Sequence, residues 1–193
     1  MAYIQCLPEH RLEDFHAAAI LWLDRLGDLH KGRLALERAA EIDIGYADVF
    51  ARLVSIARDA REMDIVAALY ERRLSLTEHA SVRADLHLAH ARVLLEVGER
   101  EGARATLRAA LELMPGHLGA LRELSQLAEA SQDWVDLESC LTRLLRVEEE
   151  DGQKLALLRR LAALYDGPLA NPSRAEAAYR RILEQVDGDD AVL

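Results

Sequence analysis

Apolar residues recur at steps of three and four along most of the chain, the spacing that places side chains on one face of an α-helix. The pattern is clearest in the segment 99–113. Its apolar face consists of Leu107, Ala110, Leu111 and, just beyond, Met114. A second such segment, 84–97, precedes it across Gly98, and Pro115 ends the pair because proline has no N–H to continue a helix. Since a helix of about 14 residues is marginal alone, the pattern predicts a packed helical hairpin.

Two sets of positions repeat with one period along the chain. In the second helix of each predicted hairpin the markers are Ala40, Leu74, Leu111, Leu145 and Leu183, spaced by 34, 37, 34 and 38 residues. In the first helix they are Ala19, Leu53, His90, Leu124 and Leu158, spaced by 34, 37, 34 and 34 residues. The extra residues fit a loop around 81–83 and a lengthened turn at 166–173, which holds two prolines and a glycine.

The shared period predicts one repeat domain, 13–189, after a lead-in of residues 1–12. Its five hairpins are expected at about 13–46, 47–80, 84–117, 118–151 and 152–189. Residues 190–193 would be the start of a further helix or the end of this stretch of sequence. Because a helical stack needs a polar cap at each end, we expect a fragment of a longer array, or ends that pack on a partner or a second copy.

The third hairpin resembles the tetratricopeptide repeat, a helix–turn–helix unit of about 34 residues. The family places a small residue, a large apolar residue, a small residue and a proline along the second helix. The matching residues are Ala103, Leu107, Ala110 and Pro115, with Ala175 and Tyr179 in the last hairpin and Leu36 and Ala39 in the first. Arg73 and Leu144 replace the family alanine in the second and fourth hairpins. The resemblance implies an all-α fold, an α-α superhelix or right-handed solenoid of about five hairpins.

The charge balance argues against nucleic acid as a partner. The chain has 34 acidic and 24 basic residues, giving a net charge of -10, and a negative protein repels phosphate backbones. The longest apolar run, 17–23, is far shorter than the ~20 residues that span a bilayer, so no direct membrane insertion is expected. Cys6 and Cys140 fit no disulfide or zinc pattern. Together with the lack of a signal-peptide pattern, this favours a reducing, bacterial cytoplasm.

One constellation could bind a metal ion. His87 and His90 lie three residues apart on the predicted helix 84–97, with Asp85 and His117 as further donors. The competing interpretation is that both histidines pack in the seam between helices, because the repeat fills these positions with packing side chains. We favour packing, and therefore expect no metal and no cofactor.

Three other segments suggest chemistry but are better explained by structure. The segment 27–34, GDLHKGRL, has the two glycines of a phosphate-binding loop but lacks its lysine and hydroxyl residue, so we interpret it as a turn. Cys140 lies among leucines and has no neighbouring base to activate it, so we expect it to pack as a small apolar residue. The segment DGDD, 187–190, is too short for a calcium loop, and we interpret it as a solvated turn.

The resemblance also implies a binding surface. In the family, outward positions of the first helix line a concave groove that binds extended peptides. The corresponding residues are Ser55, Arg58, Arg92, Arg122, Gln126 and Arg160. Three of them are arginines on consecutive hairpins, and arginine suits bidentate capture of a carboxylate, so these positions would suit an acidic segment of a partner protein or peptide. In the competing interpretation, which the sequence favours, Arg92 pairs with Glu96, Arg58 pairs with Glu62, and the other charged side chains are solvated.

The sequence therefore predicts a non-enzymatic scaffold that binds a partner protein or peptide in the groove of first-helix residues. The alternative is a structural spacer or self-association module within a larger multi-repeat protein, with homo-oligomers formed through uncapped ends of the solenoid.

Overall fold

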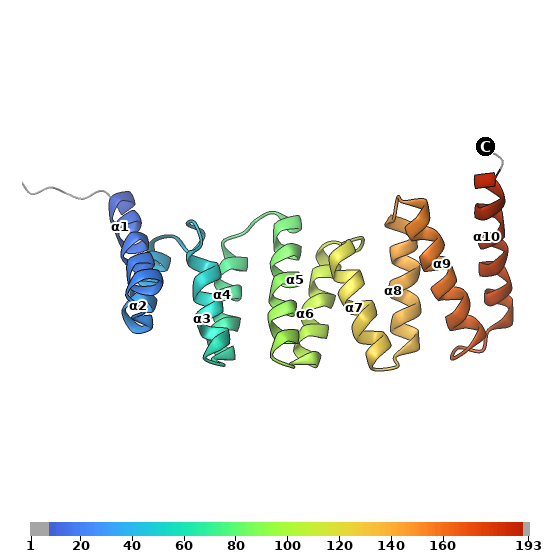
Figure 1. The fold of residues 1–193 in the computed structure, drawn as a ribbon, viewed down its shortest axis with the longest axis horizontal. Helices are drawn as coiled ribbons and strands as arrows, with labels where there is room; N and C mark the ends of the chain where they lie inside the picture. Colours follow the sequence, from blue (N-terminus) through green and yellow to red (C-terminus); the bar gives the residue numbers. More distant parts are fainter. Residues whose placement is uncertain (1–7, 191–193) are drawn as a thin grey trace, which may run out of the picture. The chain divides into compact units, whose positions relative to one another are not determined.

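The computed structural model describes the backbone of residues 8–190 and the side chains of residues 11–185. Within these residues all regular structure is helical (Figure 1). The helices are α1 Pro8–Ile20, the π-helix η1 Leu21–Arg25, α2 Leu29–Asp43, α3 Val49–Asp59, α4 Met63–Ser75, α5 Ala80–Glu96, α6 Arg100–Leu113, α7 Leu118–Ala130, α8 Trp134–Val147, α9 Asp151–Asp166 and α10 Pro172–Asp190. The predicted all-α fold is confirmed.

The helices form two compact units, Met1–Glu78 and His79–Leu193. Each unit is described by itself. In the first unit α2 packs on α1 and α3, and α3 packs on α4. In the second unit every helix from α5 to α10 packs on the next one along the chain. The second unit thus contains three successive helical hairpins.

Short turns with defined chemistry join the helices. Gly98 has φ of +91° between α5 and α6, a conformation that glycine adopts without steric cost, as the sequence predicts for this turn. Gly27 plays the same part before α2 with φ of +66°, and the Asp28 carboxylate then caps α2 by accepting the Lys31 N–H at 3.0 Å. The segment 27–34 is therefore a turn and a helix start, as predicted.

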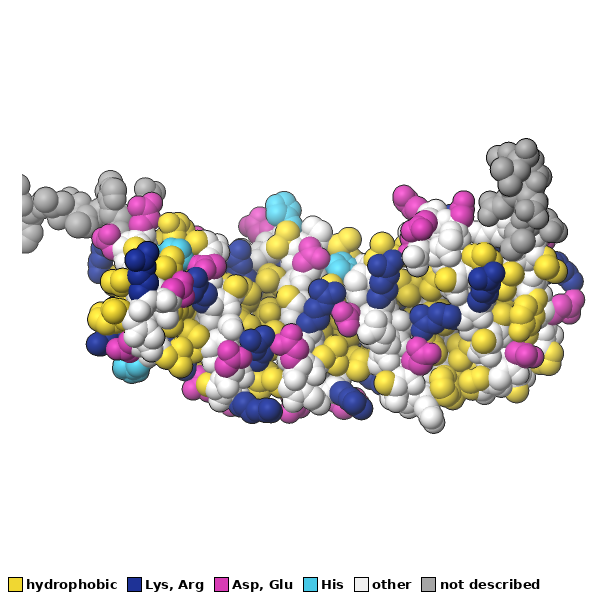
Figure 2. Space-filling model, viewed as in Figure 1, with side chains coloured by type: hydrophobic (Ala, Val, Ile, Leu, Met, Phe, Trp, Pro, Cys, Tyr) yellow, Lys and Arg dark blue, Asp and Glu magenta, His cyan; other side chains and the backbone are white. Residues whose placement is uncertain are grey.

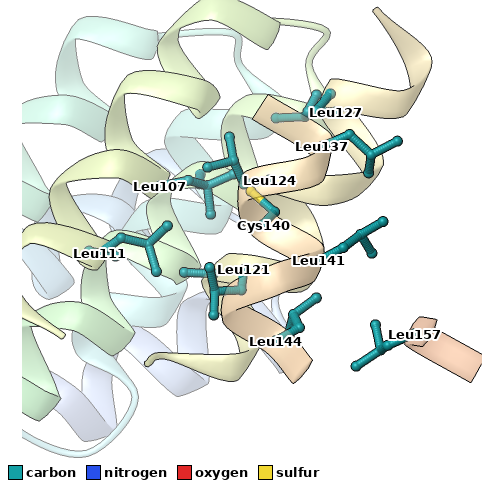
Figure 3. Packing of buried hydrophobic residues seen from close by; sticks show 14 of the residues in the cluster. Leu107, Leu111, Leu121, Leu124, Leu127, Leu137, Cys140, Leu141, Leu144 and Leu157 are labelled. Atoms are coloured by element: carbon teal, nitrogen blue, oxygen red, sulfur yellow. The ribbon is translucent and has the colours of Figure 1, made fainter. Parts of the chain in front are cut away.

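The core of the second unit is a continuous cluster of leucines and alanines from α5 to α10. Figure 3 shows the part of it between α6 and α9. The face of α6 predicted to be apolar is buried through Ala103, Leu107, Ala110 and Leu111. Alanines allow neighbouring helices to approach closely, while the leucines fill the space between them. Each hairpin thus buries its apolar faces against its neighbours in the unit.

The first unit has its own core, formed by α1, α2 and α3. A feature that the sequence does not predict is η1, a π-helical turn that continues α1. Arg52 on α3 fixes this turn by donating two hydrogen bonds to the Asp24 carboxylate at 2.9 and 3.1 Å. The Lys31 ammonium lies over the Trp22 ring at 4.3 Å from its centre. These contacts tie η1 to both α2 and α3.

The last hairpin departs in two details from the repeat pattern. Helix α10 continues through Asp190, so the interpretation of DGDD as a turn is wrong and the segment belongs to this helix. Residues 191–193, where we expected a further helix, lie outside the described part of the chain. Tyr179, which matches a packing position of the repeat, is 47% exposed. The face of α10 that contains Tyr179 and Leu183 is therefore open to solvent.

Candidate functional site

Three of the six predicted binding residues lie together. Arg122 and Gln126 on α7 and Arg160 on α9 line a pocket of about 230 Å³ in the second unit. We call this pocket the A groove. Its remaining lining residues are Ser125, Leu144, Glu148, Gln153, Ala156 and Leu157.

The period of α7 explains why these side chains reach the groove. Leu121, Leu124 and Leu127 of this helix are buried in the core. Arg122 and Gln126, one turn apart, are exposed. The same residues that anchor the helix thus aim its polar side chains outward.

Each of the three predicted arginines in the second unit, Arg92, Arg122 and Arg160, is held by a glutamate from elsewhere in that unit. Arg92 donates from Nε to Glu123 at 2.9 Å. Arg122 donates from Nη2 to Glu148 at 3.0 Å. Arg160 donates from Nη2 to Glu129 at 2.8 Å. The arginine side chains remain 56%, 56% and 41% exposed, respectively, so these ion pairs orient the guanidinium groups without burying them.

The other two predicted residues, Ser55 and Arg58, lie on α3 in the first unit. Arg58 donates from Nη2 to Ser55 Oγ at 3.3 Å and from Nε to Asp59 at 3.0 Å. Glu62, which the spacing paired with Arg58, accepts a hydrogen bond of 2.6 Å from Arg33. Arg58 is partly buried by these contacts. These two partners of Arg58 belong to its own helix, α3, whereas the glutamates bound by the arginines of the A groove lie outside the helices of those arginines.

The three histidines considered as metal ligands, His87, His90 and His117, have structural roles instead. His87 and His90 are both partly buried, as the packing interpretation predicts, and this burial lowers the pKa of each side chain. His117 accepts the Ala120 N–H on Nδ1 at 3.1 Å, capping α7, and its Nε2–H must then donate to Asp85 at 3.0 Å. Both ring nitrogens of His117 are thereby engaged. Among the residues described, no three metal-binding side chains come together.

Cys140 packs in the core as predicted. It is 2% exposed and belongs to the leucine cluster. Burial, with the Asp136 charge, raises the pKa of its thiol to about 11. The thiol is therefore protonated at neutral pH and has little nucleophilic character. Cys6 lies outside the described residues.

Charged side chains of both signs are mixed on the face that Figure 2 displays, where Lys and Arg are interspersed with Asp and Glu. The described helices include none that is both long and apolar enough to cross a bilayer.

Comparison with known proteins identifies the fold. No sequence-family profile matches the chain, and no curated protein does. Solved structures do match. The crystal structure of MamA is similar over 87% of this chain and 94% of its own, with 12% identity and a TM-score of 0.53. A tetratricopeptide repeat protein from Parabacteroides merdae matches over 92% and 67%, with 20% identity and a TM-score of 0.55. BtubC from P. vanneervenii matches over 95% and 84%, with 16% identity and a TM-score of 0.51.

Sequence, helices and comparisons agree on the class of protein. The chain is a helical-repeat protein of all-α fold. Its repeats are tetratricopeptide-like, as the residues of the third hairpin predicted. At these levels of identity the likeness concerns the fold.

Proposed function

We propose that the chain is a non-enzymatic scaffold that binds an extended, acidic segment of a partner protein in the A groove. The observation that carries the proposal is that Arg122, Gln126 and Arg160, from two different hairpins, line one pocket. A ligand in this pocket would touch α7 and α9 at once. Rigid helices would present these side chains without a large ordering cost.

The ion pairs of the groove leave its arginines able to bind a further carboxylate. A guanidinium has several N–H donors in a fixed fork. Arg122 uses one of its terminal nitrogens on Glu148, and Arg160 uses one on Glu129. Exposed ion pairs of this kind contribute about 1 kcal/mol or less, so a ligand carboxylate could share or replace them. The glutamates would then hold the arginines in place while the groove is empty.

The groove also offers amides for an extended backbone. Gln126 and Gln153 are both exposed in the pocket, one on each wall. An amide side chain can donate and accept at once, as a peptide bond requires. Leu157, in the floor between them, supplies an apolar contact. This combination favours a peptide with a free main chain and acidic side chains.

The test is to reverse the two groove arginines together. We expect Arg122→Glu/Arg160→Glu to weaken binding of an extended, glutamate-rich, fluorescein-labelled peptide by about tenfold or more, because two attractive contacts become repulsive. Fluorescence anisotropy measures the peptide. Affinity capture from the source cell with mass spectrometry identifies the natural partner, whose capture should be lost in the same variant.

The matched control is Arg100→Glu/Arg159→Glu, which has the same net charge at two exposed arginines outside the groove. It should bind like the unaltered chain. A second variant, Arg122→Gln/Arg160→Gln, avoids placing like charges beside Glu148 and Glu129, and circular dichroism checks that all variants fold. Equal binding by the groove variants and the control would refute the proposal.

A second candidate, self-association, is favoured by the open face of α10. Tyr179 and Leu183, one turn apart, are 47% and 61% exposed, and two large apolar side chains in contact with water favour burial against a partner surface. Light scattering over a range of concentrations tests it. A dimer that Leu183→Glu dissolves would support self-association, whereas a monomer at every concentration would leave the peptide-binding scaffold as the better account.

A further inference from the structure

A second groove lies on a different side of α9. Two adjoining pockets of about 400 Å³ each share Leu145, Leu158 and Arg181. They are bounded by α8 and α10, with α9 between, and we call them together the B groove. The A groove uses residues 153, 156, 157 and 160 of α9, whereas the B groove uses 154, 158, 161 and 165. The two sets of residues are offset by one position in the sequence, so they lie on faces of α9 that are about 100° apart.

The B groove is positively charged in an acidic protein. Its lining includes the basic residues Arg146, Lys154, Arg174 and Arg181, and the acidic residues Glu138 and Glu184. The equivalent groove between α6 and α8 is balanced, with Arg108 and Arg143 against Glu112 and Asp136. The groove between α2 and α4 also has two basic and two acidic residues. Of these three grooves, the one between α8 and α10 has an excess of basic residues.

Two of these cations have no counterion. Within the residues whose side chains are described, Arg146 and Arg181 are exposed and form no ion pair. By contrast, Arg108 binds Asp136 in the balanced groove. Glu138 cannot neutralise them easily, because its Oε1 already accepts hydrogen bonds from Tyr165 at 2.6 Å and Arg174 at 2.9 Å.

The floor of the groove is apolar. It is formed by Leu158 and Leu161 on α9 and by Ala178 on α10, with Leu145 on the opposite wall. The small alanine side chain leaves room for a side chain to enter from outside. The walls are helices whose backbone groups bond within the helix. The A groove offers Gln126 and Gln153 to an extended backbone, whereas the lining of the B groove includes one amide side chain, Gln185.

The spacing of the side chains along the groove indicates the backbone conformation of its ligand. Arg174 and Arg181 are seven residues apart on one helix, a rise of about 10 Å. Leu158 and Tyr165 in the floor are also seven apart on theirs. A helix presents side chains at i, i+3, i+4 and i+7 over the same distance, and it satisfies its own backbone. We infer that the B groove binds an amphipathic helix of a partner protein, with its apolar face on the floor and acidic residues along both edges.

The inference is independent of the peptide proposed for the A groove, and its test separates the two. The probe is a fluorescein-labelled, stapled helical peptide of about four turns, with leucines on one face and glutamates beside them. Arg146→Glu/Arg181→Glu should weaken its binding by about tenfold or more, and binding should weaken with added salt because the contacts are exposed. Arg122→Glu/Arg160→Glu, which has the same net charge, should leave it unchanged. Circular dichroism confirms folding of both variants.

Four outcomes with the probe would overturn the inference, and a fifth concerns the oligomeric state of the chain. The four are no binding of the probe, equal weakening by both double variants, equal binding of a peptide with the same composition but scrambled order, and loss only in the A-groove variant. If the unaltered chain forms dimers that Arg146→Glu/Arg181→Glu abolishes, the occupant is a second copy of the chain, and the assignment to a partner helix is wrong. Weakening confined to the B-groove variant, without self-association, supports it even if the A-groove peptide never binds.

Discussion

Replacing Leu121 with alanine should lower the free energy of unfolding of the second unit by about 3 kcal/mol. Leu121 is fully buried, and in Figure 3 it is flanked by Leu111 from α6 and Leu141 from α8, which belong to the same cluster. Truncation therefore removes contacts to α8 in the same hairpin and to α6 in the preceding hairpin, and it leaves a cavity between these helices. Because a helical stack is stabilised mainly by contacts between neighbours, the loss should affect the unit as a whole.

The measurement can use the two tryptophans, one in each unit. In a Trp22→Phe background, the fluorescence of Trp134 on α8 reports denaturant unfolding of the second unit alone. Leu118→Ala is the control, because Leu118 starts the same helix but is 36% exposed, and its truncation should cost about 1 kcal/mol or less. Similar losses for the two variants would mean that burial does not decide the effect.

The sequence could predict the helices because their signals are local. Gly98 and Pro115 mark the ends of α6, and the steps of three and four among Ala103, Leu107 and Ala110 set the buried face. The turn at Gly27 is predicted in the same way, because Gly27 has the same position in its hairpin as Gly98. The π-helix at 21–25 escaped prediction because contacts from other helices, such as Arg52 on Asp24, fix it.

The binding residues were predictable only as a set of outward positions. Which of them meet depends on packing between hairpins, and the sequence does not show that Arg122 and Arg160 share a pocket while Arg58 lies in the other unit. The ion pairs were missed for a related reason. Helical spacing considers partners four residues away, whereas the glutamates that bind Arg92 and Arg160 are 31 residues away in the sequence.

No single residue of the B groove marks it in the sequence. Arg146 and Arg181 lie on helices in different hairpins, and each resembles any other surface arginine. Their significance comes from what surrounds them, an apolar floor and an acidic residue already bound by Tyr165 and Arg174. The repeat period does indicate which positions line the equivalent groove in each hairpin. A comparison of the charges at these positions would indicate that the B groove is more basic than the others.

The second large effect concerns Gly32, where the usual benefit of replacing a helical glycine should be reversed. Alanine in place of glycine inside a helix normally stabilises by up to about 1 kcal/mol. Gly32 is buried in α2, however, and a Cβ there would lie 2.4 Å from both Cγ and Cδ2 of Leu23. Leu23 lies in η1, and because its Cγ would clash as well as its Cδ2, more than the end of this side chain would have to move. We therefore expect Gly32→Ala to lower the free energy of unfolding of the first unit by about 1–2 kcal/mol.

The chain contains its own control. Gly102 lies in α6, and a Cβ there would meet Leu94 at 3.5 Å, an ordinary contact. Gly102→Ala should raise the stability of the second unit by up to about 1 kcal/mol. Trp22 fluorescence in a Trp134→Phe background reports the first variant, and Trp134 fluorescence in Trp22→Phe reports the second. The steric cause also predicts rescue, because Leu23→Ala removes the clashing atoms, so the cost of Gly32→Ala should be smaller in that background. A stabilising effect of Gly32→Ala, or a cost that Leu23→Ala leaves unchanged, would show that close packing of α2 on η1 does not require a glycine.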